Sequence, residues 1–225
     1  MENNNLPALT KWQAAYIENA YRELETGITR KRIEELGLDT RGKAVLDVGC
    51  GPGNFLVAVS EDKPKLLVGV DLDDQFLTVA QAELSRRSVK NLMLVKASGI
   101  HLPFPDGFFD IVTCFLVLPH VPDDRTALAE LGRVLKANGI LAISGHDKGF
   151  PLRYLKRLRF KPLLMYLWSL LYTVTGKKWI RNTLQDYRKI CACLVEMGFI
   201  VDQITLPRKS FGLVETYRIK AIKEK

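Results

Sequence analysis

Residues 45–71 read VLDVGCGPGNFLVAVSEDKPKLLVGVD, and this stretch contains the features that predict the fold. One short apolar run ends in Asp47 and another ends in Asp71, with a glycine-rich turn and a helix-forming segment between them. The turn carries glycines at alternate positions: Gly49, Gly51 and Gly53. Because glycine has no Cβ, it adopts positive φ readily and lets a ligand approach the backbone. A carboxylate that ends the second strand can bind ribose hydroxyls, so the stretch predicts a binding unit for a nucleotide cofactor.

The spacing of the glycines argues against NAD or FAD as that cofactor. The dinucleotide fingerprint G-x-G-x-x-G needs its third glycine where this chain has Asn54. The pattern D-x-G-x-G-x-G from Asp47 to Gly53, followed by Asp71, instead resembles motif I and the acidic post-motif of class I S-adenosylmethionine (SAM) dependent methyltransferases. The glycines alone also fit a turn in another α/β protein, but the two aspartates in register favour the cofactor site.

Two further segments resemble the small-molecule members of that family, the methyltransferase type 11 group that includes quinone C-methyltransferases. Residues 98–110, SGIHLPFPDGFFD, are similar to the family pattern D-A-x-x-L-P-F-P-D-x-x-F-D, and residues 131–139, LGRVLKANG, are similar to L-x-R-V-L-K-P-G-G. The departure is Ser98, where the family has an Asp that accepts a hydrogen bond from the adenine amino group. A neutral hydroxyl accepts more weakly, by about 1 kcal/mol, so we expect weakened rather than abolished cofactor affinity.

The resemblance implies SAM as the cofactor and suggests a role for each matched residue. Asp47 would orient the ammonium of SAM, and Asp71 with the adjacent Leu72 would bind the ribose. The other cofactor contacts that it implies are the turn residues Gly49, Cys50, Gly51 and Gly53, then Ser98 and Gly99 at the adenine edge, Phe115 beside the sugar or adenine, and Tyr21 with Thr26 on the N-terminal helix.

Two histidines are the candidates for a catalytic role. Methyl transfer from a sulfonium is an in-line displacement, so the protein mainly has to position the acceptor atom. His120 and His146 follow predicted strands at their carboxyl ends, where α/β proteins bind ligands. The pKa of imidazole suits a general base near neutrality. We take His146 as the first candidate for an acceptor contact, although either histidine could instead be structural. We expect no metal site.

The order of predicted elements favours an α/β fold, a doubly wound Rossmann-like seven-stranded sheet with a C-terminal antiparallel hairpin and helical additions. An amphipathic helical pattern covers residues 8–36 and breaks at 25–27. After the second strand we expect helix 74–87, strands 91–95 and 111–118, helix 124–135 closed by Gly139, and strand 140–144. Helix 184–197 and strands 199–206 and 215–222 follow. The expected units are an N-terminal helical cap (1–39), a SAM-binding core (40–147), an insertion (148–183) and a C-terminal completion of the core (184–225).

The insertion carries the whole charge excess of the chain. The net charge is +8, yet residues 148–181 alone contain nine Lys or Arg and no Asp or Glu. One predicted helix there is apolar on one face and cationic on the other, and the next, 163–174, is apolar nearly all round but too short to span a membrane. A lid over a greasy acceptor or a membrane-interface element fits this pattern. A plain cover for the sheet and a nucleic-acid surface are the alternatives.

The sequence therefore predicts a SAM-dependent methyltransferase that acts on a small, lipophilic acceptor such as a quinone-, lipid- or isoprenoid-like molecule. One alternative is an RNA or protein methyltransferase that docks through the basic insertion, and another is a non-catalytic SAM-binding regulatory protein. The four cysteines lack C-x-x-C spacing, and residues 1–7 lack the features of a signal peptide. We expect a cytoplasmic protein, with a peripheral position at the membrane as the alternative.

Overall fold

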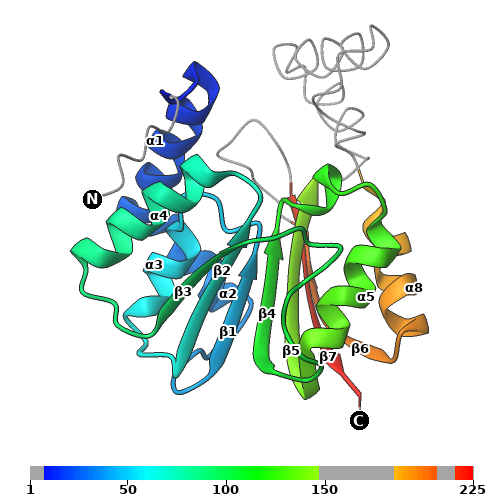
Figure 1. The fold of residues 1–225 in the computed structure, drawn as a ribbon. Coiled ribbons are helices and arrows are strands. Elements are labelled where there is room, and N and C mark those ends of the chain that lie inside the picture. Colours follow the sequence, from blue (N-terminus) through cyan, green and yellow to red (C-terminus); the bar gives the residue numbers. More distant parts are fainter. Residues whose placement is uncertain (1–7, 147–184, 207–215, 225) are drawn as a thin grey trace, which may run out of the picture.

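A computed structural model describes residues 8–146, 185–206 and 216–224 of this chain. Its centre is one seven-stranded sheet in the order β3-β2-β1-β4-β5-β7-β6, with helices on both faces (Figure 1). The first five strands run parallel, and β7 is antiparallel to both of its neighbours. The predicted α/β fold with a C-terminal antiparallel pair is confirmed.

The strands follow the apolar runs of the sequence. They are β1 (Ala44–Val48), β2 (Leu66–Asp71), β3 (Leu92–Lys96), β4 (Phe109–Phe115), β5 (Leu135–His146), β6 (Phe199–Thr205) and β7 (Thr216–Lys223). All five residues of β1 are buried. Such a continuously buried run is typical of a parallel strand that is covered on both faces.

The described helices begin in different ways, and some of them are capped by side chains. They are α1 (Lys11–Glu25), α2 (Ile28–Glu35), α3 (Asn54–Ser60), α4 (Asp74–Arg86), the 3₁₀ turn η1 (Leu118–His120), α5 (Asp124–Val134) and α8 (Tyr187–Glu196). Thr10 and Gln13 form a capping box at α1, and Asp73 caps α4. Gly27, with φ of 71°, separates α1 from α2, which confirms the predicted break.

The predicted start of β5 was wrong. The structure ends α5 at Val134 and begins the strand at Leu135, so that residues 136–139 form an irregularity inside β5 instead of a helix end. Phe109 pairs with Leu135 and Ile111 pairs with Ile140, and the extra residues bulge out between these pairs. Within the bulge Asn138 has φ of 60°, a conformation that Asn tolerates. Strand β4 also begins and ends earlier than predicted.

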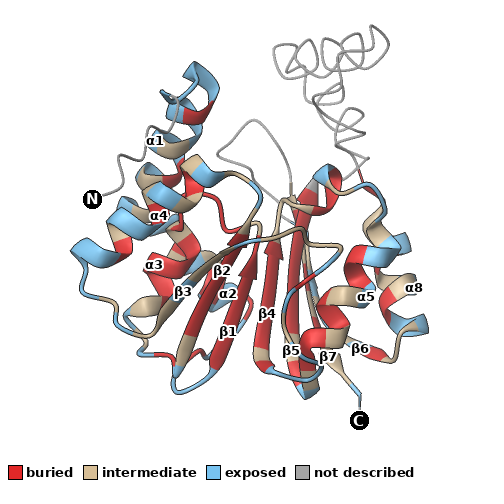
Figure 2. Cartoon of the chain, in the orientation of Figure 1, coloured by how far each residue is buried: buried red, intermediate tan, exposed pale blue. Residues whose placement is uncertain are grey.

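Two buried apolar clusters lie on opposite faces of the sheet (Figure 2). One joins the strands to α5 and α8, and the other joins them to α2, α3 and α4. Alternate residues of β5 serve the two clusters: Leu141 and Ile143 belong to the first and Ala142 to the second. The strand order reverses between β1 and β4, and ligands of open α/β sheets bind beyond the carboxyl ends of the strands at such a reversal.

Candidate active site

The glycine turn after β1 is held against the end of β2. Gly49, Gly51 and Gly53 have φ of 71°, 52° and 83°, so the alternate glycines supply the positive φ that the sequence predicts. The amides of Gly49 and Cys50 both donate to the Val70 carbonyl, at 2.7 and 2.9 Å. A Cβ on Gly49 would lie 2.1 Å from a methyl carbon of Val117. The turn therefore needs glycine for packing as well as for its backbone angles.

A cleft of about 670 Å³ opens beyond the carboxyl ends of β1, β2 and β3, and we call it the cofactor cleft. Asp71 lies in its wall, and its carboxylate accepts hydrogen bonds from the amides of Gly51 (2.8 Å) and Asp73 (3.0 Å). These bonds fix both carboxylate oxygens, each of which has a further lone pair for a ligand. The cleft also contains seven other predicted residues: Gly49, Gly51, Leu72, Ser98, Gly99, Phe115 and His120.

The loop that carries Ser98 and Gly99 is braced by Arg133. The Arg133 guanidinium donates to the carbonyls of Phe104 (2.8 Å) and Leu102 (2.9 Å), and it forms an ion pair with Glu130. Arg133 lies in segment 131–139, and Leu102 and Phe104 lie in segment 98–110. These contacts therefore hold together the two segments that resemble the same family. The planar guanidinium of Arg133 donates five hydrogen bonds in all, which is more than the ammonium group of a Lys could donate.

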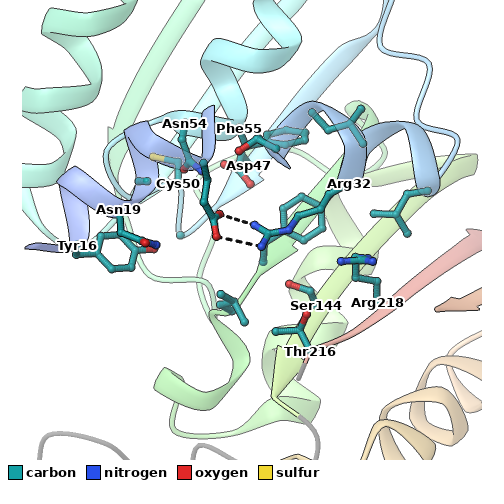
Figure 3. Close-up of a pocket in the computed structure, with 18 residues that line it drawn as sticks. Tyr16, Asn19, Arg32, Asp47, Cys50, Asn54, Phe55, Ser144, Thr216 and Arg218 are labelled. Atoms are coloured by element: carbon teal, nitrogen blue, oxygen red, sulfur yellow. Dashed lines mark hydrogen bonds and ion pairs between the residues drawn. The ribbon is translucent and has the colours of Figure 1, made fainter. Parts of the chain in front are cut away.

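A smaller cavity of about 160 Å³ lies between α1, α2 and the strand ends, and we call it the inner chamber (Figure 3). Asp47 lines it and is only 3% exposed. Burial raises the pKa of Asp47 to about 7, although the hydrogen bond from the Thr113 hydroxyl (2.6 Å) lowers it. No ion pair to Asp47 is found among the described residues. A buried carboxylate without a cation fits a ligand ammonium, so this chamber fits the amino-acid end of SAM.

A guanidinium also enters the inner chamber. Arg32 of α2 and Glu23 of α1 both line it, and Arg32 donates two hydrogen bonds to the Glu23 carboxylate (Figure 3). The chamber thus offers a carboxylate at Asp47 and a guanidinium at Arg32, which are complementary to the two charges of an amino acid. Cys50 lines the chamber too, but burial raises the pKa of its thiol, so it is no thiolate nucleophile.

The N-terminal helix contributes a different tyrosine from the predicted one. Tyr21 lines neither cavity, and its hydroxyl donates to the Pro52 carbonyl at 3.2 Å. Tyr16 lines both cavities and packs against Trp12 and Phe76, with ring centroids 5.6 and 5.3 Å apart. Tyr16 belongs to the amphipathic pattern predicted for residues 8–36, and it is 41% exposed. Both tyrosines lie against the glycine turn, Tyr21 at Pro52 and Tyr16 beside Gly51, but only Tyr16 lines the two cavities.

The two candidate catalytic histidines stay predictions. His120 ends η1 and lines the cofactor cleft, whereas it is not part of the inner chamber. The backbone of His146 ends β5, and its side chain lies outside what the structure describes. Gly53 is the N-cap of α3 and lines neither cavity. Within the described ranges, no cluster of three or more His, Cys, Asp or Glu forms a metal site.

The predicted insertion, residues 148–183, falls almost wholly in the segment 147–184 that the structure leaves undescribed. Its roles as a lid or a membrane-interface element therefore stay predictions, as does the proposed division of the chain into four units. None of the described helices is long and apolar enough to cross a membrane.

Comparisons with known proteins agree with this site. A family model described as "Methyltransferase domain" matches residues 46–143, which include β1 through most of β5. The demethylmenaquinone methyltransferase of Lactococcus lactis subsp. lactis is 28% identical over 162 residues, 70% of this chain and 64% of that protein. The demethylmenaquinone methyltransferase of a Geobacillus species is 29% identical over 184 residues, which are 77% of this chain and 76% of that protein. The chain thus spans a little under two thirds of the first relative.

A solved structure supports the fold. A SAM dependent methyltransferase from Aquifex aeolicus superposes with a TM-score of 0.66 at 18% identity, over 92% of this chain and 97% of that one. The family match covers the glycine turn, Asp71 and the Ser98 loop, so the motifs that predicted the cofactor and the geometry that surrounds them lie in the same segment. Residues 46–143 of this chain thus match a methyltransferase domain, are similar to the class I SAM-dependent methyltransferases of the type 11 family, and support S-adenosyl-L-methionine as the cofactor.

Proposed function

We propose that this protein transfers the methyl group of SAM to a small lipophilic acceptor of quinone-like chemistry. The observation that carries the proposal is the similarity to demethylmenaquinone methyltransferases over 70% or more of the chain. SAM brings an activated methyl group, so the residues of this chain have to bind and orient rather than to activate. Residues 148–183, if they act as a lid or at a membrane interface, would suit an acceptor of low solubility.

The residues of the two cavities divide the cofactor between them in this proposal. Asp71 hydrogen bonds the ribose hydroxyls, and Ser98 accepts from the adenine amino group. Asp47 pairs with the ammonium, which favours the ionised form of its carboxyl. Arg32 pairs with the carboxylate of SAM, and in doing so it exchanges part of its pairing with Glu23 for the ligand. The apolar wall around Phe115 excludes water from the space where the two ligands meet.

The test is to incubate the purified full-length protein with methyl-labelled SAM and a whole extract of the cells from which its gene comes. The products are then partitioned into organic, aqueous and precipitable fractions. Label in the organic phase is the expected result. Label confined to a nuclease- or protease-sensitive precipitate would overturn the lipophilic acceptor and favour a macromolecular one, and no label in any fraction would favour a regulatory SAM-binding protein. An Asp71→Ala variant, purified and assayed in the same way, controls for labelling by contaminating enzymes.

A further inference from the structure

Two polar atoms in the inner chamber have no hydrogen-bond partner. Among the buried side-chain atoms of the described residues, only Thr29 Oγ1 and Arg218 Nε lack one. Both residues line the inner chamber. Thr29 is 5% exposed and the Arg218 side chain 11%. A buried donor without a partner costs about 1–3 kcal/mol and is rare in native proteins. Two residues that line the chamber therefore each carry a buried polar atom that a ligand oxygen could pair with.

The charge around these atoms favours an oxygen that carries negative charge or a strong dipole. Arg218 donates through Nη2 to Glu35 at 2.6 Å, whereas its buried Nε–H has no hydrogen-bond partner. Burial lowers the pKa of Arg218, while Glu35 raises it and the neighbouring charge of Arg32 lowers it further. Figure 3 shows Arg218 beside Ser144 and Thr216, whose hydroxyls lie on the same wall. A ligand oxygen here would provide a partner for the unpaired donor of Arg218.

The sheet register separates this wall from the cofactor site. Asp47 on β1 pairs with Thr113 on β4, Thr113 pairs with Ala142 on β5, and Ala142 pairs with Lys220 on β7. Asp47 and Lys220 are therefore level with each other and three strands apart. Arg218 lies two residues farther toward the carboxyl edge, opposite Ser144. Three strand spacings are roughly 14 Å, and side chains stand nearly perpendicular to a sheet. Because the ammonium and carboxylate of an amino acid share one carbon, we expect a methionine end held at Asp47 and Arg32 to leave Arg218 Nε–H for a second ligand.

We propose that Arg218 Nε–H and the Thr29 hydroxyl bind an oxygen of the methyl acceptor, which makes Arg218 a specificity-determining residue. The acceptor would then carry a phenolate, enolate or carbonyl oxygen on its head group, while an all-hydrocarbon head group would leave both atoms unpaired. The identification of this ligand as the acceptor rests on the proposed function. The oxygen site itself rests on the two unpaired atoms and the register.

The test compares two probes that differ in one oxygen. We would measure binding of 4-fluorophenol and 4-fluorotoluene by ¹⁹F NMR to the full-length protein saturated with S-adenosylhomocysteine. Wild type should bind the phenol about tenfold more tightly, as one charge-assisted hydrogen bond implies. Arg218→Met, which keeps the length of the side chain and loses Nε–H, should bring the two probes to within about twofold. Thr29→Val should give a smaller reduction at nearly unchanged shape.

Matched controls keep the test decisive. Arg125→Met removes an exposed arginine that pairs with Glu196, and it should leave the preference for phenol unchanged. Arg218→Lys, which retains a cation for Glu35, replaces Arg218→Met if that variant does not fold. The proposal is overturned if wild type shows no preference for phenol, if the preference survives in both Arg218→Met and Thr29→Val, or if Arg218→Met weakens SAM binding about tenfold. Label in a macromolecular fraction would overturn the proposed function without changing the preference for phenol.

Discussion

The cofactor cleft and the inner chamber meet at Tyr16, Gly49 and Phe115, but the chain builds them in different ways. The cleft is built mostly from residues 48–122, in which strands, turns and loops follow one another closely, with only Trp12 and Tyr16 added by α1. The chamber combines α1 and α2 with residues as distant as Arg218. The cleft is also easier to predict from sequence motifs than the chamber, because its glycines and aspartates stand at a fixed spacing along the chain. The comparison teaches that the cleft assigned to the nucleotide end of the cofactor is built from local sequence, whereas the chamber assigned to its amino-acid end depends on residues that only the fold brings together.

The largest effect is expected for Asp71→Ala. The variant loses the acceptor for the ribose and leaves the amides of Gly51 and Asp73 without their carboxylate. Affinity for SAM, measured by calorimetry, should fall by roughly 100-fold or more, which corresponds to about 3 kcal/mol. Glu196→Ala, which removes an exposed carboxylate of α8, should change the affinity by less than about twofold. Equal losses in both variants would mean that Asp71 is not a cofactor ligand.

Asp47→Asn should weaken SAM binding less, by roughly 10- to 50-fold, through the loss of one ammonium–carboxylate pair. The same change should stabilise the ligand-free protein. In the folded state the pKa of Asp47 is raised to about 7 from an ordinary 3.8, so its contribution to stability is full below pH 3.8 and is lost as the pH rises through 7. The Asn variant should gain up to roughly 4 kcal/mol in free energy of unfolding at pH 8 and much less at pH 5. A gain that does not depend on pH would contradict a buried charge.

Tyr16→Ala and Tyr21→Phe test which tyrosine belongs to the site. Removal of the Tyr16 ring opens the wall between the two cavities and should weaken SAM binding about tenfold, the loss expected for one buried aromatic contact of about 1.4 kcal/mol. Tyr21→Phe removes only the hydrogen bond to Pro52. It should lower the free energy of unfolding by about 1 kcal/mol and leave SAM affinity unchanged. The reverse pattern would restore Tyr21 as the residue that closes over the cofactor.

The smallest expected effect is a gain. Ser98→Asp restores the charged acceptor that the family has at this position, and Ser98 lines the cofactor cleft. SAM should bind about fivefold more tightly, by about 1 kcal/mol. Adenosine should gain by the same factor, because the added interaction is to adenine. Unchanged affinity for both ligands would show that the adenine amino group binds elsewhere.

The part of the site that sequence predicted is the part whose geometry is local. The D-x-G-x-G-x-G spacing and Asp71 identified the cleft because a strand, a turn and the next strand leave few alternatives for their relative positions. Tyr16 escaped prediction because helical periodicity shows which residues share a face but not whether that face meets a core or a cavity. Arg32 and Arg218 carried no signal, since a charged residue on an amphipathic element is usually solvated and only the pairing of β7 with β5 brings Arg218 to the chamber. The bulge in β5 was missed for a similar reason: Asn138 and Gly139 are typical of a helix end as well as of a bulge.

The central claim is that the nucleotide end of SAM binds in the cofactor cleft and its amino-acid end in the inner chamber. The most direct measurement is calorimetric binding of SAM and of 5′-methylthioadenosine, which lacks the amino-acid end, to wild type, Asp71→Ala and Asp47→Asn. We expect Asp71→Ala to weaken both ligands and Asp47→Asn to weaken SAM alone. If Asp47→Asn weakens 5′-methylthioadenosine as much as SAM, or if Asp71→Ala spares it, the division between the two cavities is wrong.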